Sequence, residues 1–167
     1  MRTNARLQPV FTLRHLAYLT DCDYGLLRAI VGRSIQNPYR VFRIHKRPSP
    51  DGRSRYRTIC VPAPQLLTVH RWLVANVLNH ADSSIHAASK AFAPGCTLLR
   101  AAEPHCGAKW LIKVDVQNFF ESVSEIAAYR AFRGLGYQAL MAFEFARLCT
   151  RLGKITPRRL HPQWRRD

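Results

Sequence analysis

One aspartate of the chain has a position that suggests metal or phosphate chemistry. Asp115 directly follows the apolar run from Trp110 to Val114, which predicts a short β-strand over those residues. A carboxylate at the end of a buried strand is costly without a partner, and in a basic chain that partner is a metal ion or a phosphate-bearing substrate. The alternative left open by the spacing is that Asp115 only caps the turn after the strand.

Basic side chains gather on a predicted β-hairpin upstream of Asp115. Tyr39–Lys46 and Arg55–Val61 are rich in β-branched and aromatic residues, and Pro48–Gly52 between them has the composition of a turn. The hairpin carries Lys46, Arg47, Arg53, Arg55 and Arg57. A guanidinium can bind two phosphate oxygens at once, which suits a triphosphate ligand. The other interpretation is that these cations only protect an exposed strand edge.

The overall charge points to a polyanionic partner. The 167 residues include 26 Lys and Arg against 10 Asp and Glu, a formal net charge of +16. Nucleic acid is the first candidate. We expect no membrane partner, because neither a long apolar span nor a basic amphipathic helix is evident. The polar start of the chain and five cysteines without close pairs predict a cytoplasmic protein with reduced thiols.

Apolar periodicity predicts helices around these segments. Two short helices, 12–20 and 23–33, with Asp21 as a cap between them, form an N-terminal helical lead. A core helix is expected from Pro64 to about His80, with Trp72 packing beside it. Its broad apolar stripe consists of Leu66, Val69, Leu73 and Val77, with Leu67, Val74 and Leu78 beside them. A shorter helix is expected over 97–105.

Two more helices are expected after Asp115. Ser122 and Glu125 form a capping-box pattern that predicts a helix running to about Phe132 and ending at Gly134 or Gly136. A last helix is expected over 137–152, with Met141, Phe145 and Leu148 on one side. Residues 153–167 have no period, two prolines and several basic residues, so we expect a disordered basic tail.

Several sequence pieces, in order, resemble a known enzyme family. They are Lys46, Arg57-Thr58-Ile59-Cys60-Val61-Pro62, His70-Arg71-Trp72, Ala91-Phe92-Ala93-Pro94-Gly95-Cys96-Thr97 with Ala101, Ala102 and His105, Val114-Asp115-Val116-Gln117-Asn118-Phe119-Phe120-Glu121-Ser122, and Leu148-Cys149-Thr150. Over residues 39–150 the chain resembles the N-terminal half of a bacterial reverse transcriptase, an RNA-directed DNA polymerase of the retron or group II intron type. A retron, an intron and an antiviral defence element all remain open as the host element.

The resemblance implies an α+β fold, namely the fingers and incomplete palm of a right-hand polymerase, with helices and a small antiparallel sheet. The lead would occupy 1–38, the fingers 39–108 and the partial palm 109–152. The segment 153–167 stands where the family continues with a Gln-Gly-containing loop, and we hypothesise that it is out-of-frame translation.

The same resemblance implies roles for individual residues. Asp115 would be the first catalytic ligand of Mg²⁺, together with the carbonyl of Val116. Lys46 and Arg57 would hold the triphosphate of the incoming dNTP. Phe120 would exclude a 2′-hydroxyl and so select deoxynucleotides, the alternative for Phe120 being core packing.

The chain also departs from the family pattern. The paired aspartates of the Tyr-x-Asp-Asp sequence are missing, and the only acidic residues after Asp115 are Glu121, Glu125, Glu144 and Asp167. We therefore expect a truncated enzyme that binds RNA template, primer and dNTP but does not polymerise alone. An incomplete palm also predicts self-association. The competing interpretations are a non-catalytic nucleic-acid-binding module and, more weakly, a small-substrate enzyme.

Overall fold

The computed structural model describes residues 7–35, 37–47, 51–52, 54–81, 86, 88–91, 95–116 and 119–151. Several features predicted from the sequence lie outside these residues: most of the hairpin turn with Arg53, the Phe92–Pro94 and Gln117–Asn118 parts of the family pattern, and the 153–167 tail.

The N-terminal lead forms two helices, as predicted. Helix α1 spans Leu13–Thr20 and α2 spans Tyr24–Val31. The side chain of Asp23 caps α2 by accepting a hydrogen bond from the Leu26 amide at 2.6 Å. Asp21, which we expected between the helices, ends α1 in a left-handed conformation with φ 51°.

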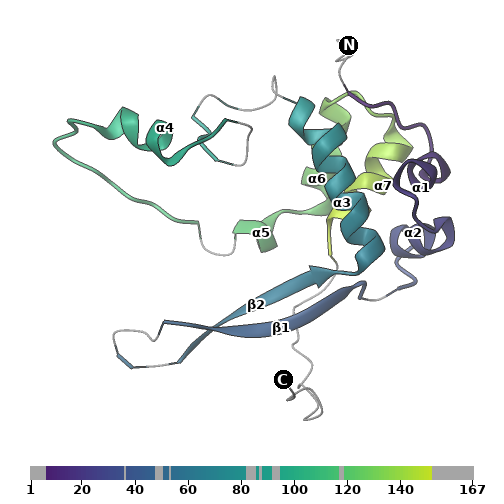
Figure 1. Ribbon diagram of the computed structural model, residues 1–167, viewed down its shortest axis with the longest axis horizontal. Coiled ribbons are helices and arrows are strands. Elements are labelled where there is room, and N and C mark those ends of the chain that lie inside the picture. The colour runs from purple at the N-terminus through teal and green to yellow at the C-terminus, as the bar shows by residue number, and fades with distance from the viewer. Residues whose placement is uncertain are drawn as a thin grey trace.

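The predicted hairpin is present. Strand β1 spans Tyr39–Lys46 and strand β2 spans Arg55–Pro62, and they form a two-stranded antiparallel sheet. Tyr39 lies opposite Pro62 and Lys46 lies opposite Arg55, so the pairing is continuous along both strands. The hairpin leaves the helical body below α3 and extends away from it (Figure 1).

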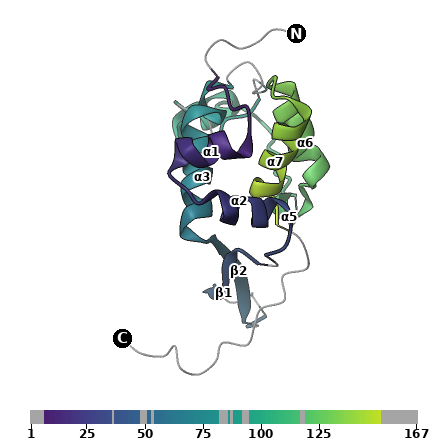
Figure 2. The ribbon, with the colours of Figure 1, turned by 90° about the vertical axis from the view of Figure 1, so that its right-hand side faces the viewer.

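The core lies among five helices, and the first two of them are far from the last two in the sequence. Helix α3 spans Pro64–Asn76 and is followed by a 3₁₀ turn, Leu78–His80, while α6 spans Glu125–Gly134 and α7 spans Ala139–Cys149. These three pack with α1 and α2 into one body from which the hairpin projects (Figure 2). The centre of each predicted apolar face is buried: Leu66, Val69, Leu73, Val77, Met141, Phe145 and Leu148. The predicted stripe on the 64–80 helix is too broad, because Val74 and Leu78 at its margin are 47% and 42% exposed. Trp72 packs against this core, as expected.

The segment before Asp115 differs from the prediction. Trp110–Val114 is extended but is not a strand, and its side chains are exposed. A strand needs a neighbour to satisfy its backbone groups, and in the described part of the chain β1 and β2 pair only with each other. The apolar pattern is therefore that of a strand, but no described segment pairs with it.

The capping box was also predicted at the wrong serine. Ser124, not Ser122, caps α6, and its side chain accepts a hydrogen bond from the Ala127 amide at 3.1 Å. Ser122 ends the short helix α5, Phe119–Ser122, and its hydroxyl donates to the Phe119 carbonyl at 2.7 Å. The first serine is thus used by α5, and the next one begins α6.

The remaining short helix is α4, Leu98–Ala102, which a 3₁₀ turn, Glu103–His105, extends to the predicted end. The fold is therefore mixed helix and small antiparallel sheet, as the α+β prediction required. Among the described residues, no helix combines the length and apolar character needed to cross a bilayer.

Candidate functional site

The hairpin brings Lys46 and Arg57 onto one face. Arg57 lies opposite Ile44, and Lys46 lies two residues beyond Ile44 on the same strand. Directly opposed residues, and residues two apart on one strand, project from the same side of a sheet. This side, which we call the basic face, consists of Arg40, Phe42, Ile44, Lys46, Arg55, Arg57, Ile59 and Val61.

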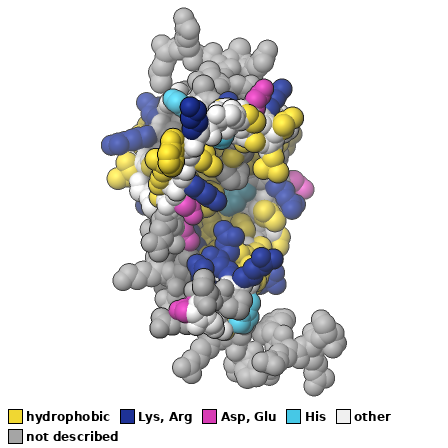
Figure 3. Space-filling model, turned by 90° about the vertical axis from the view of Figure 1, so that its left-hand side faces the viewer, with side chains coloured by type: hydrophobic (Ala, Val, Ile, Leu, Met, Phe, Trp, Pro, Cys, Tyr) yellow, Lys and Arg dark blue, Asp and Glu magenta, His cyan; other side chains and the backbone are white. Residues whose placement is uncertain are grey.

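The basic face carries four cations at exposed positions. Arg55 stands directly opposite Lys46, and Arg40 has its guanidinium 5.3 Å from the Phe42 ring centroid. Like charges directly opposite each other repel, so an anion between Lys46 and Arg55 would relieve that repulsion. Figure 3 shows Lys and Arg side chains gathered over the hairpin at this end of the molecule.

The opposite face of the hairpin has a different composition. There His45 and Tyr56 lie across from each other with ring centroids 4.3 Å apart, and Arg43 faces Thr58. Arg43 is therefore a cation on the same hairpin that projects away from the basic face. It supplies an internal control for the predicted roles of Lys46 and Arg57.

The other predicted site residues follow in the extended segment and in α5. Asp115 and Val116 are exposed, and no hydrogen bond or ion pair between described residues joins Asp115 to the hairpin. Phe120 is 71% exposed and makes an edge-on contact with Phe119, with centroids 5.5 Å apart. Phe120 therefore lies outside the core that the described residues form.

The described residues do not complete a magnesium site by themselves. No group of three or more His, Cys, Asp or Glu side chains is close enough to hold a metal ion within the described ranges. Magnesium is nevertheless often held by one or two carboxylates together with substrate phosphates and water. Asp115 fits such a shared site as one ligand, provided that phosphate and further carboxylates supply the others.

The structure shows a polar cluster that the sequence did not reveal. Arg33 donates from Nη2 to Glu125 Oε2 at 2.7 Å, and Arg147 donates from Nε to Glu125 Oε1 at 3.1 Å. Arg147 also donates to the Val31 carbonyl at 2.8 Å, which ties α7 to the end of α2. Burial alone would raise the pKa of Glu125, but the hydrogen bonds from Arg33 and Arg147 outweigh it and hold that pKa below its usual value.

Two pieces of the family pattern make contacts in or beside this cluster. Thr150 accepts a hydrogen bond from Arg33 Nη2 at 3.1 Å, and its carbonyl accepts another from Arg33 Nη1 at 2.9 Å. His70 Nε2 lies 2.8 Å from the Leu148 carbonyl and joins α3 to the end of α7. Two pieces of the pattern, around His70 and around Leu148–Thr150, thus meet in the fold and hold helices together.

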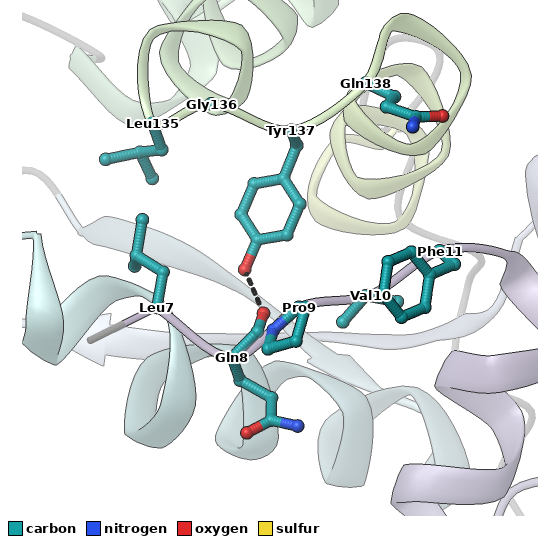
Figure 4. Close-up of a pocket in the computed structure, with 9 residues that line it drawn as sticks. All are labelled: Leu7, Gln8, Pro9, Val10, Phe11, Leu135, Gly136, Tyr137 and Gln138. Carbon is teal, nitrogen blue, oxygen red and sulfur yellow. Dashed lines mark hydrogen bonds between the residues drawn. The ribbon is translucent and has the colours of Figure 1, made fainter. Parts of the chain in front are cut away.

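A small pocket lies at the end of the helical body that is opposite the hairpin. It has a volume of about 180 Å³, and its walls come from residues 7–11 and 135–138. Tyr137 points across it and donates from its hydroxyl to the Gln8 carbonyl at 2.8 Å (Figure 4). The lining carries no charged side chain, and the tyrosine bond anchors the N-terminal segment to the turn before α7.

Comparison with known proteins shows which class of protein this chain resembles. No family model matches the chain. The retron Ec86 reverse transcriptase of Escherichia coli is 30% identical over 111 residues, which cover 66% of this chain. The retron Mx162 reverse transcriptase of Myxococcus xanthus is 36% identical over 53% of this chain, and the retron Ec83 reverse transcriptase of Escherichia coli is 29% identical over 56%.

The chain is therefore a relative of reverse transcriptases. More particularly, the resemblance to the retron type is confirmed by these three matches. The matched region spans 33%, 16% and 28% of the length of these relatives, so the chain corresponds to a third or less of each of them.

Proposed function

We propose that the chain is the substrate-binding part of a retron-type reverse transcriptase, an RNA-directed DNA polymerase that uses dNTPs on an RNA template. The observation that carries this proposal is the shared face of Lys46 and Arg57, on a hairpin of a chain with net charge +16 that is related to retron reverse transcriptases. In this assignment 39–108 forms the fingers and 109–152 the first part of the palm.

The basic face would hold the triphosphate. Arg57 can donate two parallel hydrogen bonds to phosphate oxygens, while Lys46 acts as a compact point charge. The repulsion between Lys46 and Arg55, which stand directly opposite each other, favours binding of an anion there. Phe120, with its ring exposed, is available to contact the sugar and to exclude a 2′-hydroxyl.

Mg²⁺ would be held by the Asp115 carboxylate and the Val116 carbonyl, with phosphate oxygens completing part of its shell. When bound, the ion neutralises charge on the triphosphate and polarises it. Asp115 suits this role because no described residue forms an ion pair with it, and its carboxylate is exposed.

This chain alone is proposed not to polymerise DNA. Glu125 is held by Arg33 and Arg147, and Glu144 lies within α7 with one carboxylate oxygen buried. Neither is placed to serve as a second metal ligand, and the sequence holds no adjacent pair of aspartates. A primer-extension assay with RNA template, dNTPs and Mg²⁺ tests this, since robust extension by the purified chain would refute it.

Nucleotide binding tests the role of the basic face directly. We expect Arg57→Ala and Lys46→Ala each to weaken dNTP binding about tenfold, because each removes a charge-assisted hydrogen bond to phosphate. Arg43→Ala removes the same charge from the other face of the hairpin and should have little effect. Titration with a fluorescent dNTP measures all three. Equal losses for Arg43→Ala and Arg57→Ala would show that only net charge matters.

A non-catalytic nucleic-acid-binding module is the second candidate, favoured by the lack of a multi-ligand metal cluster among the described residues. The two functions differ in what Asp115 does. In a polypeptide that also carries the remaining polymerase regions, Asp115→Ala should abolish synthesis while leaving RNA binding intact. Unchanged synthesis would favour the binding module.

A further inference from the structure

Residues 110–116, which follow a bend at Lys109, form an exposed extended segment with open backbone groups. Trp110, Ile112 and Val114 are 90%, 87% and 83% exposed, which is unfavourable for apolar side chains of this size. No backbone hydrogen bond joins residues 109–116 to any other described residue. The segment therefore has both the apolar surface and the free N–H and C=O groups of an unpaired strand.

The side chains of this segment alternate strictly. Trp110, Ile112 and Val114 would share one side of a strand, whereas Lys109, Leu111, Lys113 and Asp115 would share the other. One side is thus wholly apolar. The other carries Lys109 at its start, Lys113 close to its end and the Asp115 carboxylate at its end. A segment with opposite charges at its two ends is complementary to itself in antiparallel orientation.

We propose that residues 109–115 pair antiparallel with the same residues of a second copy of this chain, about a two-fold axis through Ile112. In this register Lys109 of each copy faces Asp115 of the other, and Trp110 faces Val114. Ile112 faces its own equivalent on the apolar side. The interface is isologous, since both copies contribute the same strand, and it stands independently of the proposed catalytic role.

The charges select this register over its neighbour. A pairing centred on Lys113 would keep the apolar residues together but would place Lys113 opposite Lys113, and like charges directly opposed are destabilising. A pairing centred on Val114 would place Lys113 opposite Asp115, but it would place Trp110 opposite residue 118, which is outside the described residues. The register centred on Ile112 gives two aromatic–β-branched pairs and two ion pairs over seven residues.

The dimer has a consequence for the candidate metal ligand. Asp115 would accept from Lys109 of the second copy, so its carboxylate would be engaged by an ammonium group instead of a metal ion. Nucleotide or metal binding at Asp115 and pairing of the two copies would then compete. The long-range repulsion between two chains of net charge +16 opposes pairing at low ionic strength and is screened by salt.

Sedimentation equilibrium of the nuclease-treated protein tests the pairing. We expect a monomer–dimer equilibrium whose dimer fraction rises as salt increases from about 0.05 M to about 0.5 M, because salt screens the repulsion between charges that are farther apart than about one Debye length. Nucleic-acid-bridged association would instead weaken with salt. A monomer at every salt and protein concentration would overturn the proposal. So would a monomer that associates only with a polypeptide carrying the remaining polymerase regions.

Two single substitutions test whether the dimer interface lies at residues 109–115. Ile112→Lys should abolish dimerisation by placing two cations at the two-fold axis, whereas Ile126→Lys, at a position 62% exposed on α6, should leave it unchanged. Circular dichroism of both variants reports whether the fold is retained. Dimerisation that survives Ile112→Lys would overturn the proposal, because the contact would then lie elsewhere.

The register has its own test. Lys109→Asp should weaken dimerisation several-fold, and adding Asp115→Lys should restore it. Lys113→Asp makes the same charge change opposite Leu111 and should not weaken it. Ile112→Cys should give a disulfide-linked dimer under mild oxidation, identified by peptide mass spectrometry. Weakening by Lys113→Asp instead of Lys109→Asp would overturn this register.

Discussion

Arg33 Nη2 lies 2.7 Å from Glu125 Oε2, joining the end of α2 to the first residue of α6 across 92 positions of sequence. The carboxylate is 28% exposed and also accepts from Arg147. We expect Glu125→Gln to lower the free energy of unfolding by about 1–2 kcal/mol, between the values of exposed and buried ion pairs. Glu121→Gln, at an exposed position in α5, is the matched control in urea unfolding and should change little.

The same cluster predicts an acid dependence of stability. The pKa of Glu125 is lower in the folded chain than its usual value, because the two arginine hydrogen bonds outweigh burial. Its stabilising contribution is therefore present above the unfolded pKa and is lost as pH falls through the folded pKa. Burial raises the pKa of Glu144, which acts in the opposite direction. The difference in unfolding free energy between wild type and Glu125→Gln should therefore shrink below about pH 4.5.

Arg33 has a left-handed backbone, with φ 59°, although it is not a glycine. Both Arg33→Ala and Arg33→Gly remove the bonds to Glu125 and Thr150. The glycine variant should nevertheless be more stable by about 1 kcal/mol, because it adopts this conformation without steric cost. Thermal unfolding of the two variants measures the difference. An alanine variant that is equal or more stable would show that the backbone conformation costs nothing.

Tyr137 anchors the N-terminal segment through its hydrogen bond to the Gln8 carbonyl. Tyr137→Phe should cost about 1 kcal/mol and increase amide exchange and proteolysis in residues 7–11. Burial raises the pKa of Tyr137 to about 12, so its contribution is complete below the unfolded pKa near 10 and is lost as pH rises toward 12. The alkaline loss of stability should therefore be smaller in Tyr137→Phe than in wild type.

Two phenylalanines, one buried and one exposed, distinguish a role in core packing from a role in substrate contact. Phe145 is fully buried against Phe132 and Tyr137, and Phe145→Ala should cost about 3–5 kcal/mol. Phe120 is exposed, and Phe120→Ala should change the free energy of unfolding by less than about 0.5 kcal/mol. Chemical unfolding of both variants checks this contrast. A large loss for Phe120→Ala would mean that its ring supports the fold instead of facing substrate.

Local patterns predicted most of the secondary structure. The β-branched and aromatic composition of β1 and β2 and the apolar spacing of α3 and α7 report interactions within a few residues, so their limits were close to those observed. The apolar run Trp110–Val114 predicted a strand wrongly. A strand also requires a neighbour, and the described residues supply none.

The sequence by itself determined the basic character of the chain, its resemblance to retron-type reverse transcriptases, and the residue types at Asp115, Phe120, Lys46 and Arg57. Only the tertiary structure decided which of them share a surface. Strand register places Lys46 and Arg57 on one face, whereas Asp115 stays apart from them among the described contacts. The Arg33–Glu125–Arg147 cluster also appeared only in the fold, because side chains far apart in sequence meet only when helices pack.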